Sequence, residues 1–443
     1  MSSPRLDLDL EAPSARKLAE AIIDAVRSGR LNQGDRLPPI RDVARQFKIS
    51  ATTVSAAWSL LNQAGTITTA RRRGTTIAVP SSGRRYRRSF DPASRFPIDV
   101  SHGEPDPALL PDLAAALATM SPRFPGPSFL DEPVLPELER VLRQEWPYAA
   151  QSMTVVNGVI NGLEVITRVA VPAGSHVIVE DPCFPPLLDL LDDRRVAVTA
   201  VPLDTDGMLP DTLDRALRRP TAAIYLQPQG QNPTGITMSP DRARVLADLA
   251  ARSHALVIED AAGAAVSCGM LSSLGRWIPG QTVHLRNFSK SHGVEVRVAA
   301  LSGPGELIGR VNSLRQIGQG WTSRILQRLL YTLLTDAHSQ RVVERAREHY
   351  RERRASVADH LAAEGIKVAG ADGYNVWLPV ADESAAMMQA ACHGVGVAPG
   401  APFTITAGHP HVRVTTSSLS GEDLHQVAAT LAQAARSSSW IRA

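Results

Sequence analysis

Lysine is scarce in this chain of 443 residues, although positive charge is not. Of the 47 basic residues only four are lysines, Lys17, Lys48, Lys290 and Lys367, and the rest are arginines. Arginine keeps its proton inside a protein and cannot form a Schiff base, whereas lysine can once burial or a nearby cation lowers its pKa. Lys290 lies in the stretch 287–297, NFSKSHGVEVR, between hydroxyl groups and a downstream arginine that can hold a phosphate. Taken alone, this stretch predicts either a Schiff-base lysine or a lysine on a serine-rich surface loop.

Cysteine and long apolar runs are scarce as well. The 3 cysteines stand far apart and form no CxxC pair, which favours a reducing cytoplasm over a disulfide scaffold or a zinc site. The longest apolar runs are too short to span a membrane, and the first residues lack the apolar region of a secretory signal. A GxxxxGK motif is missing, so a P-loop nucleotide site is not supported. His409 and His411 have no third ligand nearby in sequence, so we expect loop residues and no metal.

Acidic residues are few in the N-terminal part of the chain. Residues 1–97 contain 17 Arg and Lys against 8 Asp and Glu, a net charge of +9, whereas the remainder contains 30 against 36, a net charge of −6. A basic head on an acidic body predicts that the N-terminal part binds a polyanion.

The first 65 residues predict three helices. Residues 14–30 carry an apolar stripe, Pro39 suits the first turn of a second helix, and Ser50 can cap a third helix that Gly65 ends. Each helix has one apolar face, so the three are expected to share a core. The residues expected in that core are Leu18, Ala21, Ile22, Val26, Ile40, Val43, Ala44, Phe47, Val54, Ala57, Trp58 and Leu61.

A basic hairpin is expected after the third helix. Residues 66–79, TITTARRRGTTIAV, form two β-rich runs around three arginines and a glycine. Two helices joined by a tight turn and followed by such a hairpin are typical of a winged helix-turn-helix, whose hydroxyl and guanidinium groups bind DNA phosphates and base edges. The alternative is a three-helix core with solvated charges. The residues expected at double-stranded operator DNA are Arg41, Ser50, Thr52, Thr53, Arg71, Arg72, Arg73 and Gly74.

This segment resembles the winged helix-turn-helix of GntR-type regulators. The family pattern of LP-x-x-R, then S-x-x-TV, then a G-T wing is met by Leu37–Arg41, Ser50–Val54 and Gly74–Thr75. Ala51 departs from the pattern, because the family commonly has arginine directly after that serine. The operator sequence therefore does not follow by analogy. We expect a DNA-binding domain over residues 1–79 and a linker over the Pro-, Ser- and Arg-rich residues 80–97.

From residue 98 onward, short β-branched runs alternate with helical stretches, which predicts an α/β domain. In open α/β sheets, ligands bind beyond the carboxyl ends of the strands. Asp260 ends an apolar strand, where it can pair with a protonated ring nitrogen, and Asn232 lies in an N-P-T-G turn, where it can bond a phenolic oxygen. Gly158–Val159 precede a helix and can bind an anion, Phe184 can stack on a planar ring, and Arg413 can grip a carboxylate. Each also has a structural alternative as a cap, turn, core or surface residue.

In this order the residues resemble the fold type I pyridoxal-phosphate (PLP) enzymes of the aspartate aminotransferase class, over roughly residues 98–440. The resemblance implies a large domain around a mixed, mostly parallel sheet (about 126–330) and a small C-terminal α+β domain (about 340–443), together residues 98–443. It also implies the role of each site residue. In the family pattern, Lys290 forms the Schiff base with PLP, Asp260 pairs with the ring nitrogen and Asn232 bonds the ring oxygen. Phe184 stacks on the ring, and Arg413 binds the substrate or effector carboxylate. The phosphate is bound by Ser289, Arg297, Gly158 and Val159.

A winged helix ahead of an aminotransferase-like domain resembles the MocR subfamily of GntR regulators, across essentially the whole chain. The resemblance implies a cytoplasmic, nucleoid-associated homodimer that binds operator DNA and senses PLP, an amine or an amino acid. The stretches 101–113, SHGEPDPALLPDL, and 179–184, VEDPCF, look most like the branch tied to vitamin B6 homeostasis. The alternatives are an active PLP-dependent aminotransferase and a ligand-independent DNA-binding scaffold.

Two departures from the aminotransferase pattern bear on catalysis. Ala262 and Gly263 stand where the family usually has a tyrosine bonded to the ring oxygen, and Asn287 stands where a hydroxyl residue is common. Loss of the tyrosine hydroxyl alters the pKa of the Schiff base and weakens proton transfer. We therefore expect a sensor that attaches PLP with poor or no transamination. Efficient turnover with a common amino donor would contradict this expectation.

Overall fold

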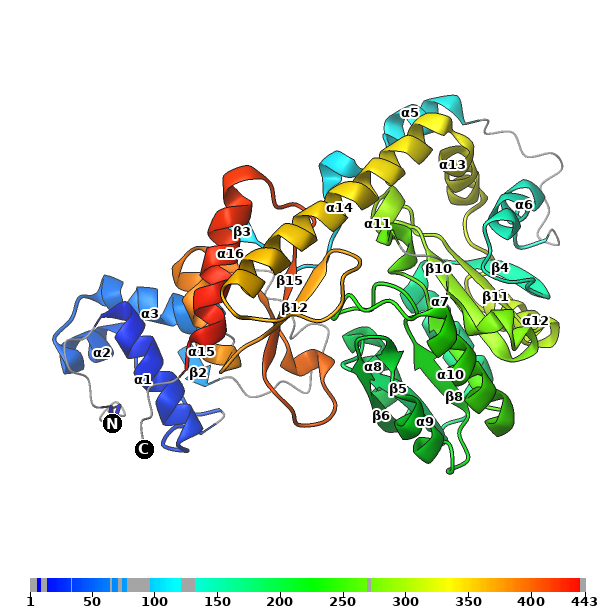
Figure 1. The fold of residues 1–443 in the computed structure, drawn as a ribbon. Helices are drawn as coiled ribbons and strands as arrows, with labels where there is room; N and C mark the ends of the chain where they lie inside the picture. The colour runs from blue at the N-terminus through cyan, green and yellow to red at the C-terminus, as the bar shows by residue number, and fades with distance from the viewer. Residues whose placement is uncertain are drawn as a thin grey trace.

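The computed structural model describes most of the chain, and three parts follow one another along it. In Figure 1 a helical N-terminal part in blue adjoins a small domain in orange and red, and a large α/β domain in green lies beyond. The long helix α14 (Ala337–Ala363) runs between the large and the small domain. The described residues are 6–8, 14–32, 34–63, 66–70, 74–77, 96–120, 132–268 and 272–438.

Three helices and a short hairpin form the N-terminal domain. They are α1 (Ala15–Arg27), α2 (Ile40–Phe47), α3 (Ala51–Gln63) and the antiparallel strands β1 (Ile67–Ala70) and β2 (Gly74–Ile77). Their apolar faces close on one core, as the helical spacing predicts. Ala21, predicted to lie in this core, is only partly buried, and its neighbours Ala19 and Ile23 are buried instead. Also buried there are Leu18, Ile22, Leu37, Val43, Ala44, Val54, Ala57, Trp58 and Leu61.

An 8-stranded mixed sheet forms the centre of the large domain. Its order is β4 (Ser152–Val156), β11 (Ala299–Gly303), β10 (Thr282–Asn287), β9 (Leu256–Asp260), β8 (Ala223–Leu226), β5 (His176–Asp181), β6 (Ala197–Asp204) and β7 (Gly207–Met208). The central run from β10 to β6 is parallel, whereas β11 and β7 pair antiparallel with their neighbours. The parallel strands place their carboxyl ends at one edge, which is where ligands bind in such sheets.

Helices cover both faces of this sheet. On one face, α7 (Val159–Ala170), α8 (Pro185–Asp193) and α12 (Gly305–Gln316) pack on the central strands. On the other face lie α9 (Pro210–Ala216), α10 (Pro240–Ser253), α6 (Pro136–Gln144), α13 (Arg324–Thr335) and α5 (Leu113–Thr119). A sheet buried on both faces explains why the central strands read as continuous apolar runs.

The small domain contains a 3-stranded antiparallel sheet of β12 (Asn375–Pro379), β15 (His411–Thr415) and β14 (Ala398–Pro399). The helices α15 (Glu383–Cys392), α16 (Gly421–Arg436) and the end of α14 pack on it. The chain enters here rather than in the large domain, because β3 (Ile98–Asp99) pairs in parallel with β13 (Val395–Gly396). Short helices complete the fold: η1 (Pro107–Leu109), η2 (Ala264–Val266), η3 (Leu274–Arg276), η4 (Pro279–Gln281), α11 (Ser289–His292) and η5 (Ala401–Phe403).

The N-terminal domain contacts the small domain. Met388, on α15, is 4% exposed and belongs to the same apolar cluster as the helices α1 and α3. In Figure 1 these helices lie directly beside α15 and α16. Across the described residues, every helix is too short or too polar to cross a membrane.

The predicted fold class is confirmed by these elements: a helical N-terminal domain with a hairpin, a mixed and mostly parallel sheet, and a small sheet domain. The domain boundaries at 79 and 97 fall near residues outside the described part of the chain and stay predictions. One expectation is wrong in part: His411 begins strand β15 and stacks on Trp377 at 4.8 Å, so only His409 lies in a loop.

Candidate functional site

Lys290 lies on the short helix α11, immediately beyond the carboxyl end of β10. The residue is partly buried, and its Nζ atom lies 5.4 Å from the centre of the Tyr374 ring. Burial lowers the pKa of this amino group to about 8, with a further decrease from Arg413 and an opposing increase from Asp260. The unprotonated amine that a nucleophilic lysine requires is therefore far more abundant near neutral pH than it is for an ordinary lysine.

Asp260 is the last residue of β9, the strand beside β10, and is 5% exposed. Its Oδ2 atom accepts a hydrogen bond of 2.6 Å from Gln227 Nε2, and its Oδ1 atom accepts one of 3.0 Å from the N–H of Ala262. Burial raises the pKa of this carboxyl group, and the bond from Gln227 and the charge of Lys290 oppose the rise. The carboxylate therefore has a high affinity for a proton or for a protonated nitrogen.

Asn232 and Arg413 come from different domains and meet at the site. Arg413, on β15 of the small domain, is 4% exposed, and its Nη1 atom lies 3.4 Å from Asn232 Oδ1 in the large domain. Its Nη2 atom donates to the carbonyl of Ser101, and the guanidinium lies 5.1 Å from the ring centre of Phe403. Gly103 passes so close that a Cβ atom there would be 3.2 Å from the guanidinium. A guanidinium held this way is oriented for a planar carboxylate.

The turn before α7 brings Gly158 against Arg297. Gly158 has a φ of +89° and caps α7, whose first residue is Val159. A Cβ atom at Gly158 would lie 3.1 Å from the Arg297 guanidinium, so only glycine leaves this approach open. Arg297 is exposed, and its Nη2 atom lies 3.4 Å from the carbonyl of Asn157. A helix N-terminus beside an arginine is an arrangement that binds phosphate.

Two further predicted residues lie at the edges of this arrangement. Ser289 directly precedes Lys290, and its hydroxyl accepts a 2.7 Å hydrogen bond from Asn287 Nδ2. Phe184 precedes α8 and lines a small cavity together with Asp260 and Gln227. The Phe184 ring also packs against the core of the large domain. Phe184 is therefore a core residue as well as a candidate to stack on a planar ring.

The residues present fit PLP. The lysine with a lowered pKa and the buried carboxyl group of raised pKa follow or end neighbouring strands, and a glycine turn beside an arginine offers donors to a phosphate. PLP has an aldehyde, a basic ring nitrogen and a phosphate, which match these three features in kind. When bound, such a cofactor supplies an electrophilic carbonyl and an electron-withdrawing ring. Among the described residues, no group of three or more His, Cys, Asp or Glu side chains is placed to hold a metal ion.

The region after Asp260 explains the missing tyrosine. A Cβ atom at Gly263 would lie 2.0 Å from the carbonyl oxygen of Gln229 and 2.7 Å from that of Gly230. Ala262 is 5% exposed, so the chain is packed tightly on both sides of this position. A tyrosine at 263 is incompatible with this backbone path, which agrees with the departure seen in the sequence.

Sequence reasoning missed Gln227, Asn157 and Tyr374. Gln227 touches both Asp260 and Asn232, Asn157 meets Arg297 and Gln319, and Tyr374 lies against Lys290. The only available signal was for Gln227, which is a polar residue directly after the apolar run of β8.

The predicted DNA-contacting residues lie around α3 and the hairpin. Ser50 caps α3, since its Oγ atom accepts the N–H of Thr53 at 3.0 Å, and it also bonds the hydroxyls of Thr52 at 2.6 Å and Thr53 at 2.7 Å. Arg41 is exposed on α2 and lines a groove of about 570 Å³ with Gly74 and with Arg36, which the sequence prediction missed. The predicted residues Arg71, Arg72 and Arg73 lie outside the described residues.

Known protein families match both parts of the chain. A family model for bacterial regulatory proteins of the gntR family matches residues 14–77, and a model for class I and II aminotransferases matches residues 99–431. The vitamin B6 salvage pathway transcriptional repressor PtsJ of Salmonella typhimurium is 33% identical over 437 residues, covering 94% of this chain and 98% of that protein. The pyridoxine biosynthesis transcriptional regulator PdxR of Corynebacterium glutamicum is 29% identical over 361 residues, covering 78% of each.

Solved structures match the body of the chain. An archaeal alanine:glyoxylate aminotransferase has a TM-score of 0.71 at 24% identity, covering 77% of this chain and 91% of that one. The α-aminoadipate aminotransferase LysN of Thermus thermophilus, solved with N-(5'-phosphopyridoxyl)-L-leucine, has a TM-score of 0.69 at 23% identity over 76% of this chain and 91% of that one. At these identities the likeness concerns the fold, which is that of the PLP-dependent aminotransferases.

Proposed function

This chain belongs to the MocR subfamily of GntR-type transcriptional regulators, and from that premise we propose that it holds PLP on Lys290 and regulates transcription in response. The observation that carries the proposal is the placement of Lys290 and Asp260 at the carboxyl ends of the neighbouring strands β10 and β9, where each charge acts on the other, in a chain that matches a DNA-binding domain near its start. In this proposal Asn232 and Phe184 hold the ring. Ser289, Arg297 and the Gly158–Val159 turn hold the phosphate.

The signal is proposed to be PLP itself, with or without an amine or amino acid. Two relatives are named for vitamin B6 salvage and for pyridoxine biosynthesis, which supports a role in vitamin B6 homeostasis. A ligand changes a protein's conformation only if it binds two states with different affinity. Arg413 supports such a difference, because it links the small domain to Ser101 and to Asn232 of the large domain. A ligand carboxylate at Arg413 would compete with these contacts.

The first test combines absorption spectroscopy with DNA binding. The wild-type protein, incubated with PLP, is expected to show a visible band at roughly 400–430 nm that Lys290→Ala lacks. A gel-shift assay on the DNA upstream of the chain's own gene is then run with and without PLP. A change in DNA affinity that requires Lys290 supports the proposal. A protein that stays colourless with added PLP would refute it.

We also propose that the functional unit is a homodimer acting on the chromosome in the cytoplasm. Ile160, Val294 and Ile317 are large apolar residues with 44%, 48% and 88% of their surface exposed. Ile160 is in the first turn of α7, Val294 follows α11, and Ile317 directly follows α12. A hydrogen bond from Asn157 to Gln319 joins the segment before α7 to the segment after α12. Large apolar side chains left exposed support a surface that a second copy covers. Sedimentation of wild type against Ile317→Glu tests this, with a monomeric wild type as the contradicting result.

An active aminotransferase is the second candidate function. It is favoured by the joint presence of Lys290, Asp260, Asn232 and Arg413, and opposed by the packed glycine at 263, which leaves no place for the usual tyrosine. An assay of keto-acid consumption with common amino donors separates the two. Slow or undetectable turnover is expected, and efficient turnover would make the enzyme the better description.

A further inference from the structure

Gln227 occupies a central place beside the proposed cofactor site. It follows β8, and both ends of its side-chain amide are engaged. The Nε2 atom donates to Asp260 Oδ2 at 2.6 Å, and the Oε1 atom accepts the N–H of Asn232 at 2.8 Å. Because the N–H of Asn232 can only donate and the ionised carboxylate of Asp260 can only accept, the orientation of the amide is fixed when Asp260 is charged. A single side chain therefore touches both the carboxyl group at the end of β9 and the turn that carries Asn232.

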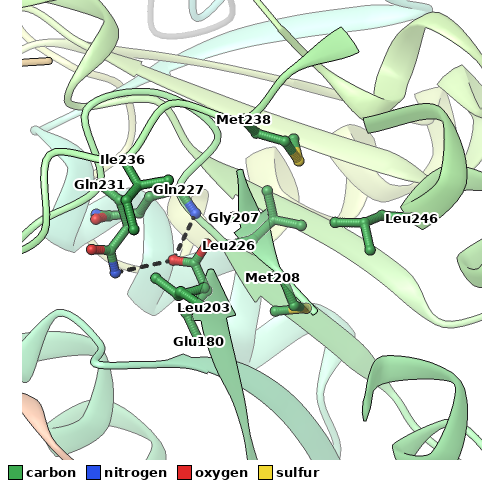
Figure 2. A pocket seen from close by; sticks show the side chains of 10 residues that line it. All are labelled: Glu180, Leu203, Gly207, Met208, Leu226, Gln227, Gln231, Ile236, Met238 and Leu246. Carbon is green, nitrogen blue, oxygen red and sulfur yellow. Dashed lines mark hydrogen bonds between the residues drawn. The ribbon is translucent and has the colours of Figure 1, made fainter. Parts of the chain in front are cut away.

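The backbone N–H of Gln227 donates to a second buried carboxyl group, that of Glu180. Glu180, on β5, is 5% exposed, and its Oε2 atom accepts the N–H of Gln227 at 3.1 Å and the Nε2 atom of Gln231 at 3.3 Å. Figure 2 shows this carboxyl group between the two glutamines, at the edge of a cavity lined by the apolar side chains of Leu203, Met208 and Met238. Gln231 in turn accepts the N–H and hydroxyl of Thr234 at 3.1 and 2.7 Å, within the same N-P-T-G turn.

We propose that Gln227, anchored by Glu180, is a positioning residue that ties the proposed partner of the ring nitrogen, Asp260, to the proposed partner of the ring oxygen, Asn232. The inference rests on the proposed function. It goes beyond that function by assigning a positioning role to a side chain that is bonded to Asp260 and Asn232 and is not among the residues proposed to bind the phosphate. Its consequence is that the two ends of the ring are held by one hydrogen-bonded unit, so disturbing Gln227 disturbs both.

The chemical effect of Gln227 is on the proton affinity of Asp260. An N–H donor stabilises the ionised carboxylate, and so it opposes the effect of burial on that group. The charge of Lys290 and the N–H of Ala262 act on Asp260 in the same direction as Gln227, and His284 has a smaller effect. Glu180 lies behind Gln227, and burial raises the pKa of its carboxyl group to about 8, so it is mostly uncharged at neutral pH and adds little negative charge. Without Gln227 the pKa of Asp260 is higher, so the carboxyl group is already protonated at a higher pH. A protonated carboxyl group no longer forms an ion pair with a protonated ring nitrogen.

The test compares variants that keep the Lys290-dependent visible band. Gln227→Leu keeps a side chain of similar length but removes both hydrogen bonds. It is expected to weaken PLP binding about tenfold or more, since a hydrogen bond to a charged group is lost. It is also expected to move the pH midpoint of the visible band by roughly one pH unit, because the proton affinity of Asp260 has changed. Both quantities come from one absorbance titration of the full-length protein with PLP at several pH values.

Leu203→Ala is the matched control. Leu203 lines the same cavity as Glu180 and has an apolar side chain, so its truncation loosens the packing and leaves the hydrogen bonds in place. Its dissociation constant for PLP is expected to stay within about twofold of wild type, and its midpoint unchanged. If Gln227→Leu behaves like this control, with the wild-type midpoint and affinity, the inference is wrong even though the proposed function stands.

Glu180→Ala separates anchoring from a direct effect. It removes the acceptor for the Gln227 N–H, so it is expected to move the midpoint in the same direction as Gln227→Leu. Combined with Gln227→Leu, it is expected to add little, because both act through one unit. Fully additive shifts would contradict the anchoring role. If Gln227→Leu does not fold, Gln227→Glu replaces it, as a carboxyl group of the same shape that must share a proton with Asp260. An unchanged midpoint in that variant would overturn the inference.

Discussion

The amino group of Lys290 lies among charges of both signs, and its reactivity follows from them. Burial and Arg413 lower its pKa to about 8 from an ordinary value of 10.5, although Asp260 opposes the change. Below that pKa the amine is mostly protonated and not nucleophilic, and above it the amine is mostly free. We expect the rate of PLP attachment to rise with pH and level off above about pH 8. Stopped-flow absorbance at a series of pH values measures it. A rate that keeps rising toward pH 10 would show that the amine is not perturbed.

Gly158 offers a second test at a single position. Its φ of +89° strains any other residue, and a Cβ atom there would stand 3.1 Å from the Arg297 guanidinium. Gly158→Ala is therefore expected to weaken PLP binding about tenfold by displacing that guanidinium. Gly174 provides the control: its φ is +77°, but no atom of the described residues lies within 4 Å of a Cβ placed there.

The two alanine variants share the backbone strain and differ in the contact. Each is expected to lose about 1–2 kcal/mol of stability, measured as a lower midpoint in urea. Only Gly158→Ala is expected to lose affinity for PLP, measured by absorbance titration. Equal PLP affinities in the two variants would mean that the approach of Arg297 to the turn does not matter for binding.

The sequence allowed prediction of side chains at strand ends but not of the groups that hold them. Asp260 and Arg413 were predicted because each interrupts or ends an apolar run, and such interruptions are visible in one sequence. Arg36 lies in a loop, where polarity is ordinary and has no period, and Gln227 directly follows the apolar run of β8, a signal that does not name its partners. Their partners lie far along the chain, for example Gln227 and Asp260, which only the folded structure brings to 2.6 Å.

At the scale of the elements, α3 depends on its cap. Ser50 Oγ accepts the N–H of Thr53 at 3.0 Å and holds the hydroxyls of Thr52 and Thr53, which are proposed to contact DNA. Ser50→Ala is expected to cost about 1 kcal/mol of stability and to weaken DNA binding as well, because both hydroxyls lose their common partner. Ser14→Ala removes the equivalent cap from α1, where Ser14 Oγ accepts the N–H of Lys17 at 3.2 Å.

Comparing the two serine variants separates cap loss from DNA contact. The midpoint temperature of thermal unfolding is expected to fall by a similar amount in both variants. The affinity for DNA, measured at fixed salt, is expected to fall mainly in Ser50→Ala. A similar loss of DNA affinity in Ser14→Ala would reduce the role of Ser50 to that of an ordinary cap.

Long periodic elements were predicted well, and short pairings were not. The helices α1 to α3 repeat their apolar residues with the helical period of 3.6, and the strand β9 is a continuous apolar run, so their positions agree with the sequence to within a few residues. The pairing of β3 with β13 involves two residues on each strand, which is too short for a pattern. It nevertheless decides that the chain enters the aminotransferase-like body at its small domain.

At the scale of the whole molecule, a continuous set of contacts joins the proposed effector group to the DNA-binding domain. Arg413 lies over Phe403 of η5, at 5.1 Å. The same segment is tied to the start of α15, because Glu383 Oε2 accepts the N–H groups of Gly400 and Ala401 at 3.0 and 2.8 Å. Five residues beyond Glu383, Met388 of α15 packs in the core of the N-terminal domain. We therefore expect a shift of the small domain to reach α1 and α3 through these contacts.

Met388→Ala tests this connection. Met388 is 4% exposed and packs with α1 and α3, so its truncation removes the main apolar contact between α15 and the N-terminal domain. We expect the variant to bind PLP and DNA each with nearly wild-type affinity, but to lose most of the effect of PLP on DNA affinity in a gel shift. Met387→Ala is the control, because Met387 lies on the same helix and packs on the core of the small domain instead. Two sites are coupled only through an element whose state both of them bias. Loss of the PLP effect in both variants would therefore indicate a general loosening of α15. If Met388→Ala keeps the PLP effect, the coupling does not pass through this contact.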